Sequence, residues 1–380
     1  MREATSAAPR VWLLLADKRG DNAQVEALAP ALGWPFERRN LVVRPEWAVA
    51  KPKVAASLDH LDLERSDALA PPWPDVILTV GRRPSMAALW VREASGGRTK
   101  LVLLGKPSGR MADFDLVIAS AEVQLPPVAN ARSIALPLMR IAEAEVADAV
   151  ATWKATLDPL PRPLIGVLVG GPTGPFVFDA AATQRLLALL RQVVQRGGTP
   201  YVTTSRRTPQ AVVDALEAQR PPGTRWFRWT PDAPDNPYRA LLGAADGLVV
   251  TGDSISMLVE AVKLRRPVAI LPLSTGPLGR LDEQRRRFSR WLFDARGTGA
   301  LHRARRAIAR AAFRAGLLSH TRDFSAFYDV LVEGGLAARS FEALAPPSGP
   351  VPDDLARAAA AVRALLGDPS SPPATAAQRI

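Results

Sequence analysis

The sequence predicts an α/β protein of two doubly wound, Rossmann-like domains that face a cleft. Three observations support this prediction: short apolar strands alternate with helical patterns in the first half, a proline-rich stretch interrupts them, and the same alternation then starts again. Strands that are apolar along their whole length are typical of parallel sheets covered by helices on both faces.

The first half contains four expected strands. They are VWLLL at 11–15, DVILTV at 75–80, KLVLLG at 100–105 and DLVIAS at 115–120, and helical spacing follows the first two strands, in NAQVEALAPALG and SMAALWVREA. Strands of a parallel sheet need such helical connections. The stretch LDPLPRP at 157–163 then has the composition of a linker.

The second half repeats the pattern. Strands are expected at 164–171, 201–205, 226–229, 247–251 and 267–273, and helices at 179–196, 209–219, 237–244 and 254–264. We therefore expect an N-terminal domain over 1–157 and a C-terminal domain over 158–345. Residues 346–380 are expected to form a loop, a terminal helix and a disordered tail, because proline, serine and alanine dominate them.

The composition excludes several classes of site. The chain has no cysteine, which rules out disulfides, thiolate metal ligands and cysteine nucleophiles. Its three histidines, His60, His302 and His320, are too widely spaced to predict a metal site. None of them has a nearby acid in a motif typical of a serine hydrolase. Neither a GxGxxG motif after a strand nor a P-loop motif occurs. We expect no metal ion and no cofactor.

Charge and hydropathy bear on where the protein acts. No apolar run reaches about eighteen residues, and the VWLLLA run is too short for a signal peptide, so we expect a cytoplasmic protein. The net charge of +12 favours anionic partners. Residues 285–314 hold ten arginines, with Asp294 as their only acid, so the excess charge forms a patch.

The arginine patch has two interpretations. It is a surface for anionic lipid, peripheral on the inner membrane, with an apolar side made of Phe288, Trp291, Leu292 and Phe293. Alternatively, its helices are simply solvated and the aromatic residues lie in the core. Nucleic acid is not an expected partner, because no recognition motif accompanies the charge.

Three loops after second-half strands favour a phosphate site. Gly170 and Gly171, followed by Thr173, offer backbone amides to an anion. In TTSRRTP at 203–209, Ser205 stands beside Arg206 and Arg207, whose guanidinium groups suit phosphate oxygens, and one of the two arginines is expected to be solvated.

The segment VTGDSISMLVEA at 250–261 adds a helix start, where free amides favour a diphosphate. Glu260 lies four residues after Ser256, a rise of roughly 6 Å, about the distance from a diphosphate to the ribose hydroxyls. The alternatives are a surface pair of Glu260 with Lys263 and a plain N-cap for Asp253. Together the loops favour a nucleoside-diphosphate site.

The segments GDNAQ, VGGP, TTSRRTP and NPYRALLGAADGLVVTGDSISMLVEA resemble the mitochondrial fission ELM family, whose bacterial members are described as predicted nucleoside-diphosphate-sugar enzymes. The resemblance implies a GT-B-like fold, with the acceptor in the N-terminal domain and the nucleotide-sugar donor in the C-terminal domain. Carried onto this chain, the family pattern marks as donor-binding Gly170, Gly171, Ser205, Arg206, Arg207, Asn236, Tyr238, Asp253, Ser254, Ser256 and Glu260.

These observations lead to the hypothesis of a metal-independent glycosyltransferase, with Asp21 as the first candidate for the base that activates the acceptor and Asp17 as the second. Either residue could instead cap a helix over 22–32. The rival hypothesis is a non-catalytic GT-B-like scaffold that recruits partners at a membrane. It is favoured by the sequence ASAEVQ at 119–124, which has Glu122 where the family has a His-Asp pair.

Overall fold

The structure is a computed structural model of the 380-residue chain. It describes residues 8–49, 53–108, 110–126, 128–231, 233, 235–276, 279, 283–284, 286–288, 291–292, 299–314 and 322–367. The chain forms two compact units. Unit 1 consists of residues 1–140, 289–323 and 353–380, and unit 2 of residues 141–288 and 324–352.

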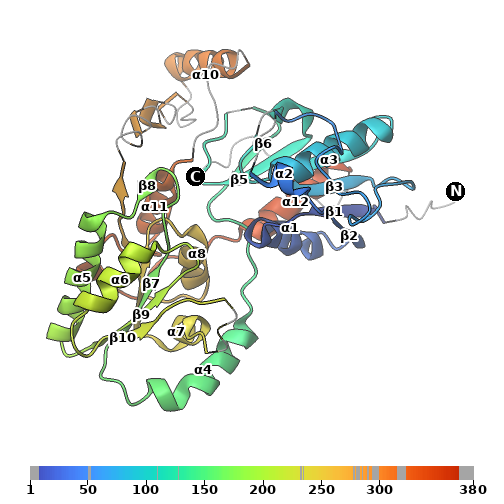
Figure 1. Cartoon of the computed structure of the whole chain (residues 1–380). Helices are drawn as coiled ribbons and strands as arrows, with labels where there is room; N and C mark the ends of the chain where they lie inside the picture. The colour runs from blue at the N-terminus through green and yellow to red at the C-terminus, as the bar shows by residue number, and fades with distance from the viewer. Residues whose placement is uncertain are drawn as a thin grey trace, which may run out of the picture. The chain divides into compact units, whose positions relative to one another are not determined.

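Unit 1 contains a six-stranded parallel sheet in the order β2-β1-β3-β4-β5-β6 (Figure 1). Its strands are β1 (Val11–Leu15), β2 (Phe36–Asn40), β3 (Val76–Val80), β4 (Lys100–Leu104), β5 (Leu116–Ser120) and β6 (Ala131–Ile134). Its helices are α1 (Arg19–Ala31), α2 (Pro45–Val49), α3 (Arg82–Ala94), η1 (Met111–Asp113), α10 (Ala300–Arg314) and α12 (Asp354–Leu365).

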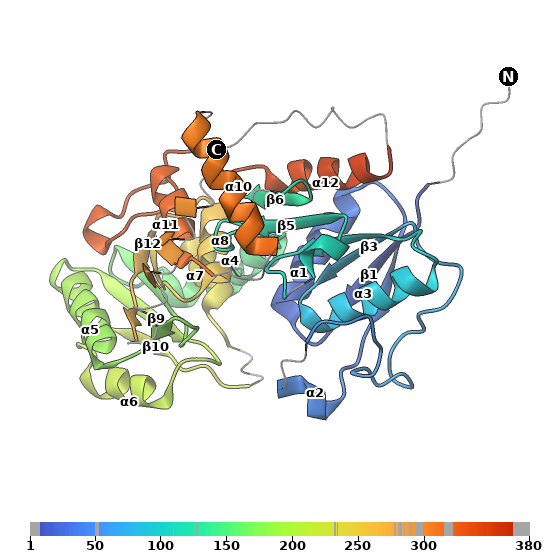
Figure 2. The same ribbon diagram turned by 90° about the horizontal axis from the view of Figure 1, so that it is seen from above.

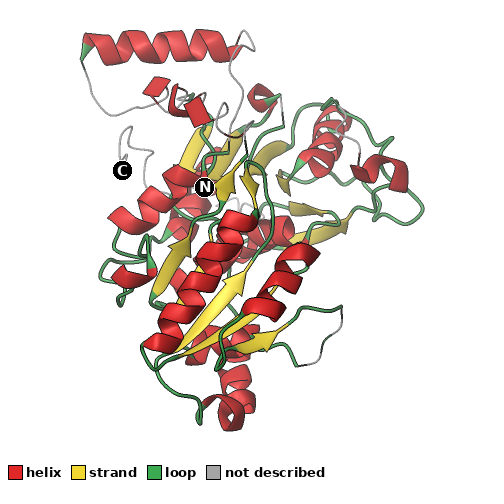
Figure 3. Ribbon diagram, turned by 60° about the vertical axis from the view of Figure 1, so that its left-hand side comes forward, coloured by secondary structure: helices red, strands yellow, loops and turns green. Residues whose placement is uncertain are grey.

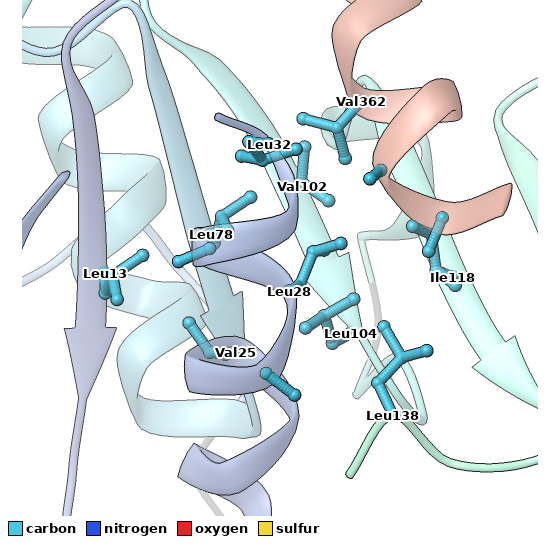
Figure 4. Close-up of a cluster of buried hydrophobic side chains, with 14 of the residues drawn as sticks. Leu13, Val25, Leu28, Leu32, Leu78, Val102, Leu104, Ile118, Leu138 and Val362 are labelled. Atoms are coloured by element: carbon cyan, nitrogen blue, oxygen red, sulfur yellow. The ribbon is translucent and has the colours of Figure 1, made fainter. Parts of the chain in front are cut away.

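The strands of unit 1 alternate their side chains between two apolar layers, as a pleated sheet requires. Leu13 packs with α1 and α12 on one face, whereas Trp12 and Leu14 pack with α3 on the other. Figure 4 shows Leu28 of α1 and Val362 of α12 in the first layer, and Figure 2 shows the helices around the sheet. Helices on both faces make unit 1 doubly wound.

Unit 2 contains a five-stranded parallel sheet in the order β10-β9-β7-β11-β12, and a short antiparallel pair of β8 and β13. Its strands are β7 (Leu164–Val169), β8 (Phe176–Val177), β9 (Thr199–Thr204), β10 (Arg225–Phe227), β11 (Gly247–Thr251), β12 (Val268–Leu271) and β13 (Ser274–Thr275). Its helices are α4 (Glu143–Leu157), α5 (Ala180–Gln195), α6 (Gln210–Gln219), α7 (Tyr238–Ala244), α8 (Ile255–Lys263), α11 (Phe324–Glu333) and η2 (Phe341–Ala343).

Helices also cover both faces of the second sheet (Figure 3). Ile165 and Val167 of β7 pack with leucines of α5 and α6. The intervening residue, Gly166, lies against Leu241 of α7 and Leu248 of β11, so α7 is on the opposite face. The predicted α/β class with two doubly wound, Rossmann-like sheets is confirmed, while the predicted cleft stays a prediction.

The units do not follow the predicted boundaries of 157/158 and 345/346. Helix α4 belongs to unit 2, because it packs along α7: Arg239 bonds Glu145 at 2.6 Å, and Gly243 lies against Val146 and Val150. At the other end, α12 belongs to unit 1. Proline-rich composition at 157–163 therefore marks a turn within unit 2.

Candidate functional site

The topology of unit 2 brings the three predicted loops together. In the order β9-β7-β11, the loops after these strands are neighbours at the carboxyl edge of the sheet. From β7 the chain adds β9 and β10 on one side and β11 and β12 on the other, so the strand order reverses between β7 and β11. Doubly wound sheets bind ligands at such a switch point.

The two glycines after β7 are held by side chains of the protein itself. The Gly170 amide donates to Thr251 Oγ1 at 2.7 Å, and the Gly171 amide donates to Asp253 Oδ2 at 2.9 Å. A Cβ at Gly170 would overlap the Asp253 carboxylate, and one at Gly171 would overlap the carbonyl oxygen of Arg207. The expectation that these amides are open to an anion is therefore wrong, and tight packing inside the protein explains both glycines.

The Asp253 side chain bonds to the loops after β7 and β9 and does not cap α8. The N-cap of α8 is Ser254, which makes no side-chain cap bond. The Asp253 side chain is fully buried, and its Oδ2 also accepts a bond from the Arg207 guanidinium at 3.1 Å. Its Oδ1 is buried and has no partner among the described residues. Burial raises the pKa of Asp253, against the opposing effects of the Gly171 amide and the Arg207 charge.

Because Asp253 turns toward the β7 loop, it leaves the start of α8 open. In the part of the chain that the structure describes, the first-turn amides of Ile255, Ser256 and Met257 donate to no acceptor. Ser254 is buried and Ser256 is exposed. The predicted helix start thus has unpaired donors at the switch point, which is what binding an anion requires.

The two adjacent arginines after β9 differ in their surroundings. Arg207 donates to both Asp253 and the Thr173 hydroxyl, which fixes its guanidinium group between two loops. Arg206 is exposed and has no hydrogen-bond or ion-pair partner among the described residues. Arg207 is exposed as well, so the two arginines differ in their described partners and not in their access to solvent.

Thr208 joins the β9 loop to the β7 loop, a role that no motif in the sequence indicates. Its hydroxyl lies 2.6 Å from the carbonyl oxygen of Gly170 and 3.1 Å from that of Val169. The Ser205 amide donates to the same hydroxyl at 2.9 Å. The Ser205 side chain is thereby directed to neighbours in its own loop, with its Oγ 3.2 Å from Thr208 Oγ1.

Glu260 is paired with a tyrosine. Its Oε2 accepts a hydrogen bond of 2.8 Å from the Tyr238 hydroxyl, the first residue of α7. The alternative of an exposed Glu260 on the helix surface does not describe this residue, because Glu260 is half-buried and its carboxylate accepts the Tyr238 bond. Burial raises the pKa of Glu260, against the Tyr238 hydrogen bond and the Arg239 charge. Burial and the Glu260 charge raise the pKa of Tyr238 well above its usual range, so its hydroxyl remains a donor.

A second tyrosine supports the turn before α8. The Tyr328 hydroxyl of α11 donates to the carbonyl oxygen of Gly252, and a Cβ at Gly252 would crowd that hydroxyl. Burial and then the Asp253 charge raise the pKa of Tyr328. No local motif indicates this contact, since 76 residues separate the two partners.

In unit 1, both aspartates lie near the end of β1. The helix α1 starts at Arg19 with Lys18 as its N-cap, so neither Asp17 nor Asp21 caps it. Asp17 is exposed, whereas Asp21 is half-buried in the first turn, with Oδ2 3.7 Å from the position of a Cβ on Gly81. Gly81 follows β3, and the strand order reverses between β1 and β3. Asp21 thus lies at the switch point of unit 1.

Two of the three histidines lie within the described residues, and each is beside an arginine of its own unit. His60 is fully buried, with Nε2 2.9 Å from the carbonyl oxygen of Arg83, and burial lowers its pKa. His302 lies in α10 beside Arg305, with 3.3 Å between the Nδ1 and guanidinium nitrogens, and His320 lies outside the described residues. Across the described ranges, no three His, Cys, Asp or Glu side chains form a group able to hold a metal ion.

The two Rossmann-like units and the donor-rich carboxyl edge of unit 2 place this chain in a broad class of two-domain α/β proteins that includes the GT-B-like fold. Within that class, the chain belongs to the mitochondrial fission ELM1 family, whose model matches residues 19–310. The family resemblance predicted from the sequence is thereby confirmed.

Relatives of known sequence are distant. The Arabidopsis thaliana mitochondrial fission protein ELM1 is 24% identical over 220 residues, which are 52% of this chain and 51% of that protein. The match therefore spans about half of the Arabidopsis protein. The uncharacterized protein RP120 of Rickettsia prowazekii is 22% identical over 294 residues, covering 68% of this chain and 82% of that protein. Among solved structures, Acinetobacter baumannii MurG superposes over 93% of this chain and 90% of its own, with 13% identity and a TM-score of 0.41.

Proposed function

We propose that unit 2 binds a nucleoside-diphosphate sugar and that the protein transfers the sugar to an acceptor. The observation that carries this proposal is the start of α8, where three unpaired amides lie at the switch point of the sheet. Arg207, on the β9 loop, contacts Asp253 just before α8, and Glu260 is about one and a half turns into α8. The amides and the guanidinium suit a diphosphate, and a carboxylate suits the hydroxyls of a ribose.

The same groups would act during transfer. Negative charge develops on the departing diphosphate as the bond to the sugar breaks, and fixed donors that stabilise this charge lower the barrier. Arg207 is fixed by Thr173 and Asp253 before any ligand binds, so little reorganisation is needed. Asp21 is the preferred candidate for the base that accepts the proton of the acceptor hydroxyl, because it is at the switch point of unit 1, whereas Asp17 is exposed.

The first test concerns the donor. We expect UDP-, GDP- or ADP-glucose to bind the wild-type protein, and Glu260→Ala to weaken the best of them about tenfold or more, since it removes a charged hydrogen-bond acceptor. Isothermal titration calorimetry measures both affinities. Equal affinity in the two proteins would remove Glu260 from the site. Hydrolysis or transfer assays with the same donors separate an enzyme from a scaffold, because a scaffold binds the donor without turning it over.

We further propose that α10 binds an anionic membrane surface. No helix in the described ranges is long and apolar enough to span a bilayer. Leu301 and Ile308, seven residues apart and therefore on one face, are 79% and 61% exposed. The 15 residues of α10 contain five arginines and no acidic residue. An exposed apolar stripe on a basic helix suits the interface of an anionic bilayer.

Two of the aromatic residues before α10 support the proposal that this region binds a membrane surface. Phe288 and Trp291 are 54% and 56% exposed, so the alternative that they lie in the core is wrong for these two residues. Leu292 is buried, and Phe293 lies outside the described residues. The apolar side predicted from the sequence therefore does not include Leu292.

We expect the protein to float with vesicles of phosphatidylcholine and phosphatidylglycerol and not with phosphatidylcholine alone. The double variant Leu301→Glu, Ile308→Glu should lose this binding, because it places charge on the apolar stripe. Leu63→Glu is the matched control, since Leu63 is 57% exposed but lies outside α10. Equal flotation with both vesicle types, or by the double variant and the control, would contradict the proposal.

A further inference from the structure

Glu260 is the only acceptor that the proposed function assigns to the ribose, and the structure shows one of its two oxygens already in use. Oε2 accepts the Tyr238 hydroxyl, whereas Oε1 accepts no hydrogen bond from the described residues and is not completely buried. The tyrosine therefore fixes the rotation of the carboxylate. Oε1 is therefore the oxygen of Glu260 with its full hydrogen-bonding capacity left for a ligand.

Tyr238 can hold Glu260 in place because the tyrosine is itself anchored. Its amide donates to Asn236 Oδ1 at 3.0 Å, which fixes the start of α7. The next residue, Arg239, pairs with Glu145 of α4 at 2.6 Å. Further along α7, Gly243 allows the close approach of α4. The phenol thus projects from a helix that is secured at both ends.

The charge of Glu260 also strengthens its hydrogen bond with Tyr238. A hydrogen bond from a phenol to an ionised carboxylate is stronger than one between neutral groups. Burial and the Glu260 charge raise the pKa of Tyr238 well above its usual range, so the phenol keeps its proton and stays a donor to Glu260. An unrestrained glutamate would instead lose side-chain rotational freedom when a ligand binds, and this loss weakens affinity.

We propose, on the basis of the proposed function, that Tyr238 is a positioning residue that turns Oε1 of Glu260 toward the ribose hydroxyls and so makes the site selective for ribonucleotides. Asn236, Tyr238 and Glu260 then form one unit, in which only Glu260 touches the ligand. This role explains why a half-buried phenol at the start of α7 faces a carboxylate of α8.

The test compares UDP, GDP and ADP with their 2′,3′-dideoxy forms by calorimetry, so that the contribution of the ribose hydroxyls is isolated. We expect the wild-type protein to prefer the ribonucleotide by about tenfold or more. Tyr238→Phe should reduce this preference several-fold and leave the affinity for the dideoxy form unchanged. The matched control is Tyr201→Phe, which removes a second phenol of unit 2, one that is buried and has no hydrogen bond with Glu260.

Damage to the fold would weaken the binding of the ribonucleotide and of its dideoxy form equally. A reduced preference for the ribonucleotide therefore indicates a loss of positioning by Tyr238 and not a loss of structure. As a second variant, Glu260→Gln should keep its bond with Tyr238 but lose most of the preference, because a neutral amide replaces the charged acceptor. An unchanged preference in Tyr238→Phe or in Glu260→Gln would overturn the inference while leaving diphosphate binding intact. Failure of the wild-type protein to bind any of the three nucleotides would overturn the inference and the proposed function together.

Discussion

Replacing Gly171 by alanine should destabilise the protein by about 3 kcal/mol, the upper part of the range for forced overpacking. The added methyl group would overlap the carbonyl oxygen of Arg207, and a backbone atom cannot move aside as a flexible side chain can. Relief would require the β7 and β9 loops to separate, which would break the bond from the Thr208 hydroxyl to the carbonyl oxygen of Gly170. For a unit of this size, the melting temperature should fall by roughly 10 °C.

Differential scanning calorimetry measures this change. Gly174→Ala serves as the control, because it adds a methyl group in the same loop where no atom lies within 4 Å of the new Cβ. Equal melting temperatures for Gly171→Ala and the wild-type protein would show that the two loops are not packed as described.

The second large effect concerns the two neighbouring arginines. Arg207→Ala should weaken the binding of UDP, or of whichever nucleoside diphosphate binds, by about 30-fold to 100-fold, whereas Arg206→Ala should change it less than about threefold. A charged hydrogen bond contributes about 1.5 to 3 kcal/mol, and only a guanidinium held in place delivers this contribution without a further entropy cost. Both arginines are exposed, but Arg207 is held by Thr173 and Asp253, while Arg206 has no hydrogen-bond or ion-pair partner among the described residues.

Calorimetric titration of both variants at about 0.15 M salt provides the measurement, since screening then limits the effect of remote charge. Thermal melting of each variant checks that the loss of Arg207 beside Asp253 has not unfolded unit 2. A larger loss in Arg206→Ala than in Arg207→Ala would move the phosphates away from the β7 loop and contradict the proposed site.

Central strands could be predicted from the sequence because burial on both faces makes them continuously apolar. This is why β1, β3, β4, β5, β7 and β11 were expected within a residue or two of their observed bounds. The edge strand β2, with the sequence FERRN, gave no such signal, because four of its five side chains are polar and most are exposed. Helix α12 could be predicted as a helix, but its packing on α1 depends on contacts across more than 300 residues.

The sequence predicts which loops and residues form the candidate site, but it does not predict which of these residues bond to one another. The sequence indicated which loops meet, because parallel strands place their carboxyl ends on one edge. It did not indicate that Thr251 and Asp253 would take the Gly170 and Gly171 amides, since burial forces polar groups to find partners that a local motif does not show. The same holds for Thr208 and Tyr328, whose partners lie 38 and 76 residues away.

The contribution of α12 to unit 1 also affects the order in which the protein is made. Val362, Ala358 and Ala359 complete the apolar layer that Leu13 and Leu28 begin. A ribosome releases α12 only after all of unit 2 has been synthesised, although domains otherwise tend to fold in the order of their emergence. The unit that starts first is thus finished last, and until then nascent unit 1 has an uncovered apolar surface over α1.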